Sequence, residues 1–389
     1  MDATAFEPIL PPEGDPELED LAVRLVARAN QLAGQLSPAV RASVGDLVRS
    51  MNCYYSNLIE GHNTHPRDID RALADNYSKD PKKRALQREA RAHIEVQRLI
   101  DSGKDPRCHP TSEAYVKWVH YEFCSRLPEE LLIVRSPKGR EVRVIPGELR
   151  DGDVDVGHHM PPPHEDLPKF MTRIAQAYDP SRLSATRRII SVAAAHHRLL
   201  WVHPFYDGNG RVARLISHAM LLRSDVGSSV WSVARGLARQ VEAYKMHLMH
   251  ADEPRHGDLD GRGALSTKRL KEFCEFFLAT CLDQIEFMES LLQPTEILRR
   301  MKLYVDDEVA AGRLPKGSLA LLREALLAGE LERGKAADLT GYQVRRGREI
   351  LARLLQVGLL VSQGPRAPVR LGFPTDVVER WFPKLFPTD

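Results

Sequence analysis

The residues best suited to chemistry lie in one stretch, His203–Arg214, which reads HPFYDGNGRVAR. His203 is a natural proton acceptor near neutral pH. Asp207 offers a carboxylate of the kind that holds Mg²⁺ against a phosphate group. Arg211 and Arg214 are spaced i, i+3, so their guanidinium groups lie on one face of a helix. A base, a metal ligand and two cations together predict transfer of a phosphorus-containing group to a hydroxyl.

Two predicted helices must position this stretch. An apolar run at 189–200 precedes it, and a second run at 212–222 follows it. Pro204 ends the first helix, while Gly208 and Gly210 allow a tight turn and the close approach of a ligand. The second helix then presents unpaired N–H groups and the positive end of its dipole. This arrangement predicts an anion hole that would take phosphate.

The stretch resembles the signature of the Fic family, H-P-F-x-[DE]-G-N-G-R-x-x-R, and matches all nine fixed positions. Proteins with the intact motif resemble AMP transferases, which use ATP and Mg²⁺, join AMP to a Ser, Thr or Tyr hydroxyl, and release pyrophosphate. The resemblance implies that His203 deprotonates the target hydroxyl and that Asp207 binds Mg²⁺. It implies phosphate contacts from Gly208, Asn209, Gly210, Arg211 and Arg214.

A second motif ends the helix predicted from Pro38 to about residue 60. Ser56-Asn57-Leu58-Ile59-Glu60-Gly61 resembles the Fic inhibitory motif [ST]-x-x-x-E-[GN], with Ser56, Glu60 and Gly61 at its fixed positions. A carboxylate that reaches Arg214 would form a charge-assisted pair and occupy the guanidinium meant for the γ-phosphate. The resemblance therefore implies that Glu60 inhibits the enzyme; an ordinary solvated helix-terminal glutamate is the alternative.

A hairpin is predicted before the signature. Two β-rich runs, 131–134 and 141–145, surround a turn at Ser136–Gly139. The region that follows resembles the Fic flap, which would align the extended backbone of a protein target by strand addition. The flap residues are Val154, Asp155, Val156 and Gly157.

Two later helices carry features with more than one interpretation. Tyr244, on the helix predicted at 237–249, lies where Fic proteins often carry a tyrosine near adenine, so adenine stacking and a place in the core are both open. The apolar stripe of the helix at 267–292 is typical of a core or of a homodimer surface.

A dinucleotide site and a zinc site have less support in the sequence. Residues 208–213 also fit the dinucleotide pattern G-x-G-x-x-A, with Asp225 downstream, but no strand precedes them. A zinc site is disfavoured because the histidines lack a known ligand spacing and have no acidic or cysteine partners. These histidines are His158, His159, His164, His196 and His197.

The C-terminal region resembles a winged helix-turn-helix. Helices are predicted at 318–328, 335–339 and 342–357, and short strands at 358–361 and 369–371. Residues 313–370 contain 11 Lys or Arg against 5 Asp or Glu, a local net charge of +6. A basic helix here would suit the DNA major groove, although winged helices also dock proteins.

Composition excludes several classes of protein. The 389 residues are 43% apolar, which indicates a globular chain. The net charge of +2 is too small to attract nucleic acid or a membrane surface to the chain as a whole. No apolar run approaches the roughly 20 residues of a membrane helix, and residues 1–20 lack signal-peptide features. Five cysteines without a C-x-x-C motif suggest free thiols in a reducing cytoplasm. Residues 1–15 read as a loose tail.

The sequence thus predicts a mainly α protein: an N-terminal helical region (1–110) with the inhibitory helix, a Fic helical core (111–293) with its hairpin flap, and the winged helix (294–389). We expect an AMP transferase that modifies a protein hydroxyl and itself. In one alternative, Glu60 positions a water so that the site removes AMP. A Doc-like kinase is disfavoured by Gly210 and the paired arginines. A DNA-binding regulator with a nucleotide-sensing core is the third alternative.

Overall fold

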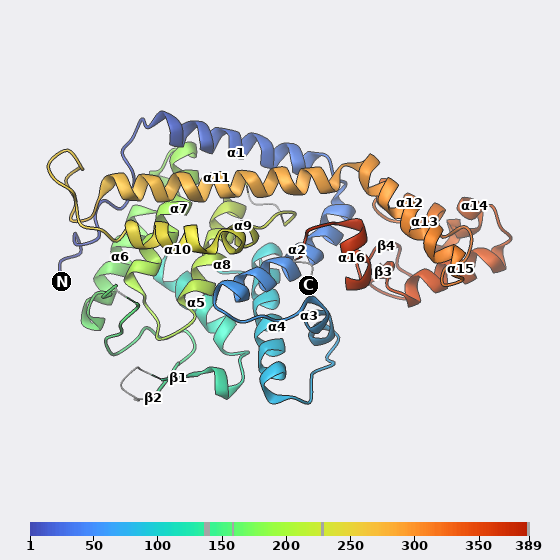
Figure 1. Ribbon diagram of the computed structural model, residues 1–389, viewed down its shortest axis with the longest axis horizontal. Helices are drawn as coiled ribbons and strands as arrows, with labels where there is room; N and C mark the ends of the chain where they lie inside the picture. The colour runs from blue at the N-terminus through green and yellow to red at the C-terminus, as the bar shows by residue number, and fades with distance from the viewer. Residues whose placement is uncertain (136–140, 158, 227–228, 387–389) are drawn as a thin grey trace. The chain divides into compact units, whose positions relative to one another are not determined.

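The computed structural model describes residues 1–135, 141–157, 159–226 and 229–386 (Figure 1). Within these residues the chain is mainly α-helical, as predicted, with two short antiparallel hairpins. The predicted turn at 136–139 and His158 lie outside the described residues. The chain divides into two compact units, and α1, α2 and α11 each contribute residues to both units.

The first unit comprises residues 1–30, 52–228 and 232–284 and contains the signature. Its hairpin pairs β1 (Ile133–Arg135) with β2 (Glu141–Arg143), and Val134 lies opposite Val142. Three 3-10 turns occur at Glu129–Leu131, His164–Asp166 and Pro180–Arg182. Its α-helices are α1 (Pro16–Gly34, in part), α2 (Pro38–Ile59, in part), α3 (Pro66–Leu73), α4 (Pro81–Asp101), α5 (Glu113–Cys124), α6 (Leu167–Ala177), α7 (Ala185–Val202), α8 (Asn209–Arg223), α9 (Val233–Arg239), α10 (Val241–His250) and most of α11 (Thr267–Leu292).

Helices α7 and α8 form the centre of this unit and carry the signature between them. Ser184 caps α7, because its hydroxyl oxygen accepts from the N–H of Arg187 at 3.3 Å. The apolar face of α7 is buried, and α8 is buried along most of its length. Helix α8 begins at Asn209, three residues before the predicted apolar run, because Gly208 (φ 82°) already turns the chain into it. The signature is therefore held between two buried helices.

The N-terminal residues are packed, so the prediction of a loose tail is wrong. Phe6 is fully buried, and its ring stacks on Trp201 with centroids 5.5 Å apart. The carbonyl of Glu7 accepts from the N–H of Leu265 at 2.8 Å. Apolar burial and backbone pairing, neither visible in an acidic, proline-rich stretch, fix this segment. Helix α1 then lies along α11 (Figure 1).

The predicted helix at 237–249 is two helices. The chain breaks at Gln240 (φ −122°, ψ 37°), between α9 and α10. The stripe of α11 is buried within the chain from Leu270 to Cys281, which agrees with the core interpretation.

The second unit comprises residues 31–51, 229–231 and 285–389. Its remaining elements are α12 (Pro294–Ala310), α13 (Ser318–Leu327), a 3-10 turn (Arg333–Lys335), α14 (Ala336–Thr340), α15 (Val344–Gln356), β3 (Leu360–Ser362), β4 (Val369–Leu371) and α16 (Thr375–Trp381). Elements α13 to β4 lie where the sequence predicts them. Leu360 pairs with Leu371, and Leu331 bridges Val369 at the strand edge. Helix α16 was not predicted; it buries Trp381.

The winged helix-turn-helix assignment and the three-part division of the chain stay predictions. Among the described residues, no helix combines the length and the apolar character that a membrane crossing requires.

Candidate active site

His203 lies at the end of α7 in a left-handed conformation (φ 49°, ψ 61°), with its N–H bonded to the carbonyl of Leu199 at 3.1 Å. A non-glycine residue in this conformation is strained and persists only where its surroundings hold it. Burial lowers the pKa of His203 to about 4, and the positive charge of Arg150 adds to the effect. The imidazole is therefore neutral near pH 7, as a general base requires.

The signature loop is closed by its own side chains. The Asn209 amide donates to the carbonyl of Phe205 at 2.8 Å, and its oxygen accepts from the N–H of Phe205 at 3.0 Å. The side chain of Asn209 thus shapes the loop, and any contact with phosphate would come from its backbone. The Phe205 ring is fully buried and stacks on His120, with centroids 3.7 Å apart.

His120 supports the loop from α5 and was missed from the sequence. Its Nδ1 accepts from the N–H of Gly147 at 2.9 Å, and its ring lies 3.6 Å from where a Cβ on Gly208 would be. Burial lowers the pKa of His120 to about 4, so the ring stays neutral. In sequence, His120 is one residue of an amphipathic helix without a motif, and no local signal marks it.

Arg214 is held by the end of α2. Its Nε donates to the hydroxyl of Ser56 at 2.9 Å, and its Nη2 donates to the Ser56 carbonyl at 3.0 Å and to Oε1 of Glu60. Burial alone would raise the pKa of Glu60, but the charges of Arg214 and Arg211 lower it overall. The contact between Glu60 and Arg214 expected from the sequence is therefore present as a charge-assisted pair, and its inhibitory role stays a prediction.

Glu60 also occupies the start of α8. Its Oε1 lies so close to where a Cβ on residue 210 would be that a side chain at this position would displace the carboxylate. Gly61 (φ 83°) ends α2, with its N–H bonded to the carbonyl of Leu58 at 3.0 Å. The carboxylate faces the positive end of the α8 dipole, which is where a phosphate would bind.

Arg211 pairs with a carboxylate that sequence reasoning missed. Glu89, on α4, is completely buried and accepts from Nη1 of Arg211. Its other oxygen contacts Nδ1 of His62 at 2.7 Å, and this hydrogen bond raises the pKa of His62. Helix α4 reads as a basic, solvated helix because of its lysines and arginines. Its one inward glutamate is found only when the helix is packed against α8.

Asp207 is suited to hold a cation. Its side chain is 48% exposed, and its Oδ1 accepts from the N–H of Gly208 at 2.6 Å and from Nη2 of Arg211 at 3.1 Å. Mg²⁺ usually takes one or two carboxylates together with water and substrate phosphates. One accessible carboxylate beside an anion hole fits that donor set.

The comparisons with known proteins agree with this geometry. Residues 110–221 match the model of the Fic/DOC family. These residues form a Fic/DOC domain. The chain is 31% identical over 180 residues to the Protein adenylyltransferase Fic of Nematostella vectensis, which covers 44% of this chain and 37% of that protein. The chain is also 38% identical over 78 residues to the relative of the same name from Drosophila erecta, and this match covers 20% of this chain and 16% of that protein. The chain thus aligns with well under half the length of these relatives.

Solved structures show the fold. A Fic family protein from Desulfovibrio desulfuricans G20 has a TM-score of 0.54 at 18% identity, covering 94% of this chain and 98% of that chain. A Fic domain containing signaling protein from Bacteroides thetaiotaomicron VPI-5482 has a TM-score of 0.51 at 18% identity, covering 69% of this chain and 95% of that chain. Both support the helical architecture of the Fic/DOC domain and its surroundings.

Tyr244 lies beyond the Fic/DOC match and is a core residue. Its side chain is only 2% exposed, and its hydroxyl bonds to Nε2 of His196 at 2.7 Å. Ser217 donates to the carbonyl of Ala213, so His196 donates from Nδ1 to Ser217 and accepts from Tyr244 at Nε2. A buried ring leaves no open face for adenine, and this corrects the stacking alternative in favour of the core one.

The flap residues 154–157 lie outside the hairpin β1–β2: residues 154 and 155 are irregular, and Gly157 belongs to a turn that begins at Val156. Val156 and His159 exchange two backbone hydrogen bonds of 3.1 and 2.9 Å. The turn is joined to the signature of the Fic/DOC domain through Asp151, which accepts from the Tyr206 hydroxyl at 2.7 Å. The predicted flap is therefore next to the signature loop.

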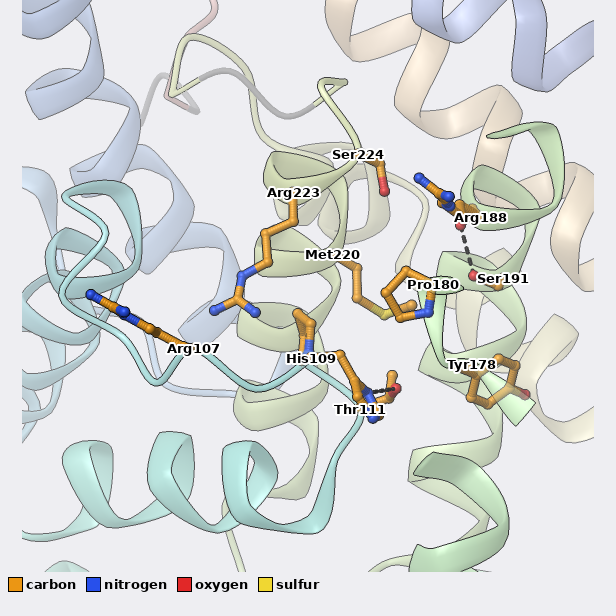
Figure 2. A pocket seen from close by; sticks show the side chains of 11 residues that line it. Arg107, His109, Thr111, Tyr178, Pro180, Arg188, Ser191, Met220, Arg223 and Ser224 are labelled. Carbon is orange, nitrogen blue, oxygen red and sulfur yellow. Dashed lines mark hydrogen bonds between the residues drawn. The ribbon is translucent and has the colours of Figure 1, made fainter. Parts of the chain in front are cut away.

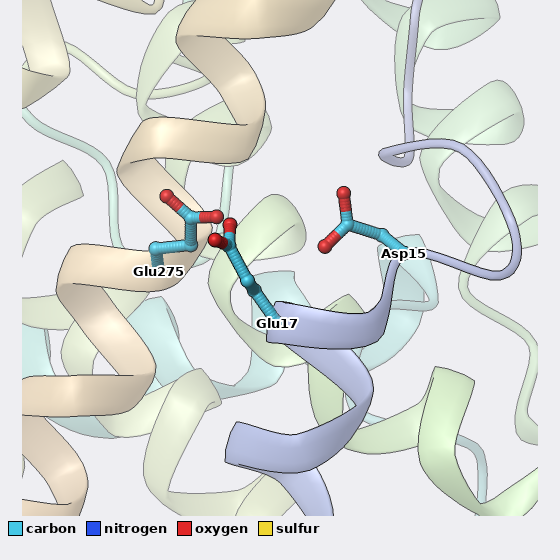
Figure 3. Close-up of side chains that lie close together, drawn as sticks. All are labelled: Asp15, Glu17 and Glu275. Carbon is cyan, nitrogen blue, oxygen red and sulfur yellow. The ribbon is translucent and has the colours of Figure 1, made fainter.

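Within the described residues, the histidines considered for a zinc site form hydrogen bonds with other groups of the protein. His159 bonds the carbonyl of Trp201, His164 bonds Asp153, and His197 bonds the carbonyl of Leu248. The expectation that these histidines lack acidic partners is wrong, because Asp153 pairs with His164 and Asp252 lies 3.1 Å from His197. A cluster that could suggest a metal instead joins Asp15, Glu17 and Glu275 (Figure 3). The ammonium of Lys271 already pairs with all three carboxylates, at 2.9, 2.9 and 3.2 Å.

A separate hollow of about 180 Å³ lies at the far end of α8, near Arg107, Arg188 and Arg223 (Figure 2). Arg223 there donates to Asp105 and to the carbonyls of Pro106 and Cys108, so it holds the loop before α5. Helix α8 spans about 20 Å from the signature to this hollow at 1.5 Å per residue. The hollow is thus distinct from the proposed catalytic centre.

Proposed function

We propose that the Fic/DOC domain transfers AMP from ATP to a Ser, Thr or Tyr hydroxyl of a protein, including its own, and releases pyrophosphate. One observation carries the proposal: a neutral, half-buried His203 lies at the loop that opens α8, beside the anion hole and Arg214. The relatives named Protein adenylyltransferase Fic support the same chemistry.

In this reaction His203 accepts the proton of the target hydroxyl. The hydroxyl oxygen bonds to the α-phosphorus, the bond from that phosphorus to the bridging oxygen breaks, and pyrophosphate leaves with the electron pair. The N–H groups at the start of α8 and the guanidinium groups of Arg211 and Arg214 stabilise the phosphate charge. Asp207 would hold Mg²⁺, which supplies further charge neutralisation when bound.

Glu60 would restrain this activity. Its carboxylate bonds Arg214 and lies against Gly210, so it competes with a phosphate group for the same cation and the same space. ATP would then bind in a pose that keeps its α-phosphorus away from His203. The alternative role, in which Glu60 positions a water to remove AMP, uses the same contacts and is separated by experiment.

The flap residues 154–157 would dock the extended backbone of the target. Because backbone pairing reads little sequence, specificity would come from other surfaces. Five unpaired cysteines support a reducing compartment, the cytoplasm, as the place of action.

The second unit supports a second, separate proposal: contact with a polyanion such as duplex DNA. An open hollow of about 550 Å³ is lined by Arg313, Lys316, Arg346 and Arg353. Arg345 is 94% exposed, although Arg345 and Arg346 both pair with Glu349. Binding of the full chain to a DNA duplex should weaken steeply with salt. Salt-independent binding, or none, would favour protein docking by this unit.

The activity is tested with ATP labelled on either the α- or the γ-phosphate. The Glu60→Gly variant with Mg²⁺ should retain the α-label and lose the γ-label, while Glu60→Gly/His203→Ala should retain neither. Retention of the γ-label would show phosphate transfer, the chemistry of a kinase, and refute the proposal. If neither label is retained, a protein already carrying AMP is added to the wild type; release of AMP would assign the removal reaction.

A further inference from the structure

We infer that Arg150 is a positioning residue: its buried guanidinium fixes the backbone of His203 and both ends of the segment that carries the flap residues 154–157. The inference rests on the proposed function, since it concerns how that site is held. Arg150 lies between the hairpin β1–β2 and the turn, in the stretch that resembles the Fic flap, where the sequence assigns it no role of its own.

The contacts of Arg150 converge on three pieces of backbone. Its Nε donates to the carbonyl of His203 at 2.9 Å, and its own N–H donates to the carbonyl of Pro204 at 2.9 Å. Its Nη1 donates to the carbonyl of Gly152 at 3.0 Å, and its Nη2 donates to the carbonyl of Pro162 at 2.5 Å. One side chain therefore joins the signature loop to the start and the end of the docking segment.

Together with a bond from His159, these bonds satisfy carbonyls at the end of α7 and directly after it. The last carbonyls of a helix have no partner within it. His159 donates from Nε2 to the carbonyl of Trp201, in the last turn of α7, at 2.7 Å, while Arg150 bonds the carbonyls of His203 and Pro204, which follow the helix. Both donors come from the 150–162 region, so this region holds His203 in its strained conformation.

The geometry requires an arginine. Three separate guanidinium nitrogens donate to three different carbonyls, and the side chain is completely buried. Lysine keeps the charge but places all its donors on one nitrogen, so it cannot bridge the same carbonyls. The carboxylate of Asp153 is 3.7 Å from Nη1, beyond hydrogen-bonding distance, so the hydrogen bonds of the Arg150 guanidinium go to backbone carbonyls.

The charge also acts on the His203 ring. The charged or titratable groups that face His203 are Arg150, His159 and Asp207. Arg150 lowers the pKa of His203, and Asp207 opposes this. Loss of the Arg150 charge should therefore raise the pKa of His203, which a purely structural role for Arg150 would not require.

The test places Arg150→Lys and Arg150→Gln in the Glu60→Gly background. In both variants we expect kcat for AMP transfer to fall by about 10- to 100-fold, the loss typical of a reactive group displaced by about 1 Å. KM for ATP should change by less than about threefold, because the anion hole and Arg214 are untouched. The acid limb of the pH–rate profile should move to higher pH in Arg150→Gln and much less in Arg150→Lys.

The matched control is Arg187→Lys, in the first turn of α7. Arg187 donates to the carbonyls of Pro11 and Pro12 at 2.8 and 3.1 Å, so its replacement also removes bonds to backbone, but at the end of α7 away from His203. This control should keep kcat within about twofold of its parent. Amide hydrogen exchange should speed up in residues 151–157 only when Arg150 is changed.

The inference is overturned if Arg150→Lys keeps full kcat, or if both Arg150 variants lose ATP binding and fold together, since Arg150 would then serve stability alone. Circular dichroism and ATP titration distinguish these outcomes. If the Glu60→Gly parent itself transfers no AMP, the proposed function fails instead. The hydrogen-exchange comparison then still decides whether Arg150 holds the 151–157 segment.

Discussion

Replacing Glu60 with glycine perturbs the contact that most directly separates an inhibited site from an active one. The carboxylate bonds Nη2 of Arg214 and fills the space over Gly210. A charge-assisted hydrogen bond of this kind is worth about 1.5–3 kcal/mol. Because about 1.4 kcal/mol is a factor of ten, we expect kcat/KM for AMP transfer to rise by about 10- to 100-fold.

Matched variants separate charge from space. Glu60→Gln removes the charge but keeps the volume, so we expect an increase of only about 3- to 10-fold. Ser56→Ala removes the hydroxyl that accepts from Nε of Arg214 but leaves Glu60 in place, so activity should not rise. Initial rates with labelled ATP measure AMP transfer, and titration with ATP and with ADP measures nucleotide binding.

The reasoning is refuted if Glu60→Gly transfers AMP no faster than wild type while remaining folded. It is also refuted if Glu60→Gly tightens the binding of ADP as much as that of ATP. The structure places Glu60 on the cation assigned to the γ-phosphate, so its removal must favour the triphosphate.

Three further predictions concern charge and protonation. Glu89→Gln should lower the free energy of unfolding by about 3–5 kcal/mol in denaturant titration, because it leaves the charge of Arg211 buried; the half-buried Glu95→Gln should cost less than about 1 kcal/mol. In an NMR titration the His203 ring should titrate near pH 4, and a midpoint near 6.5 would contradict its burial. Both ring nitrogens of His93 are buried without a hydrogen-bond partner among the described residues, and burial lowers its pKa to about 3. In the unfolded chain this histidine takes up a proton below about pH 6.5, so the free energy of unfolding decreases as pH falls from 6.5 toward 3. The variant His93→Leu should reduce that decrease by about 1–2 kcal/mol at pH 5. An unchanged decrease would show that His93 is not its cause.

The sequence predicts those parts of the fold whose signals are local. Pro38 and Gly61 bracket α2, and helical spacing of apolar residues defines α11 at both ends. The signature residues gather because they are close in sequence and flank a helix start. The pairing of Glu60 with Arg214 joins residues far apart in the chain, and it was expected only through the resemblance.

What the sequence does not predict depends on distant packing. Glu89 is one glutamate in a helix rich in lysine and arginine, and only its burial against Arg211 marks it. Arg150 reads as an ordinary loop arginine until the carbonyls of His203, Gly152 and Pro162 surround it. The N-terminal tail was mistaken for the same reason: composition suggests a solvated segment, but Phe6 finds a place in the core.

The measurement that tests the central claim most directly is the intact mass of the protein after incubation with ATP and Mg²⁺. We predict that Glu60→Gly gains the mass of AMP, that wild type gains little, and that Glu60→Gly/His203→Ala gains none. An added AMP on the double variant would show that His203 is not the base. An added phosphate in place of AMP would contradict the reaction itself.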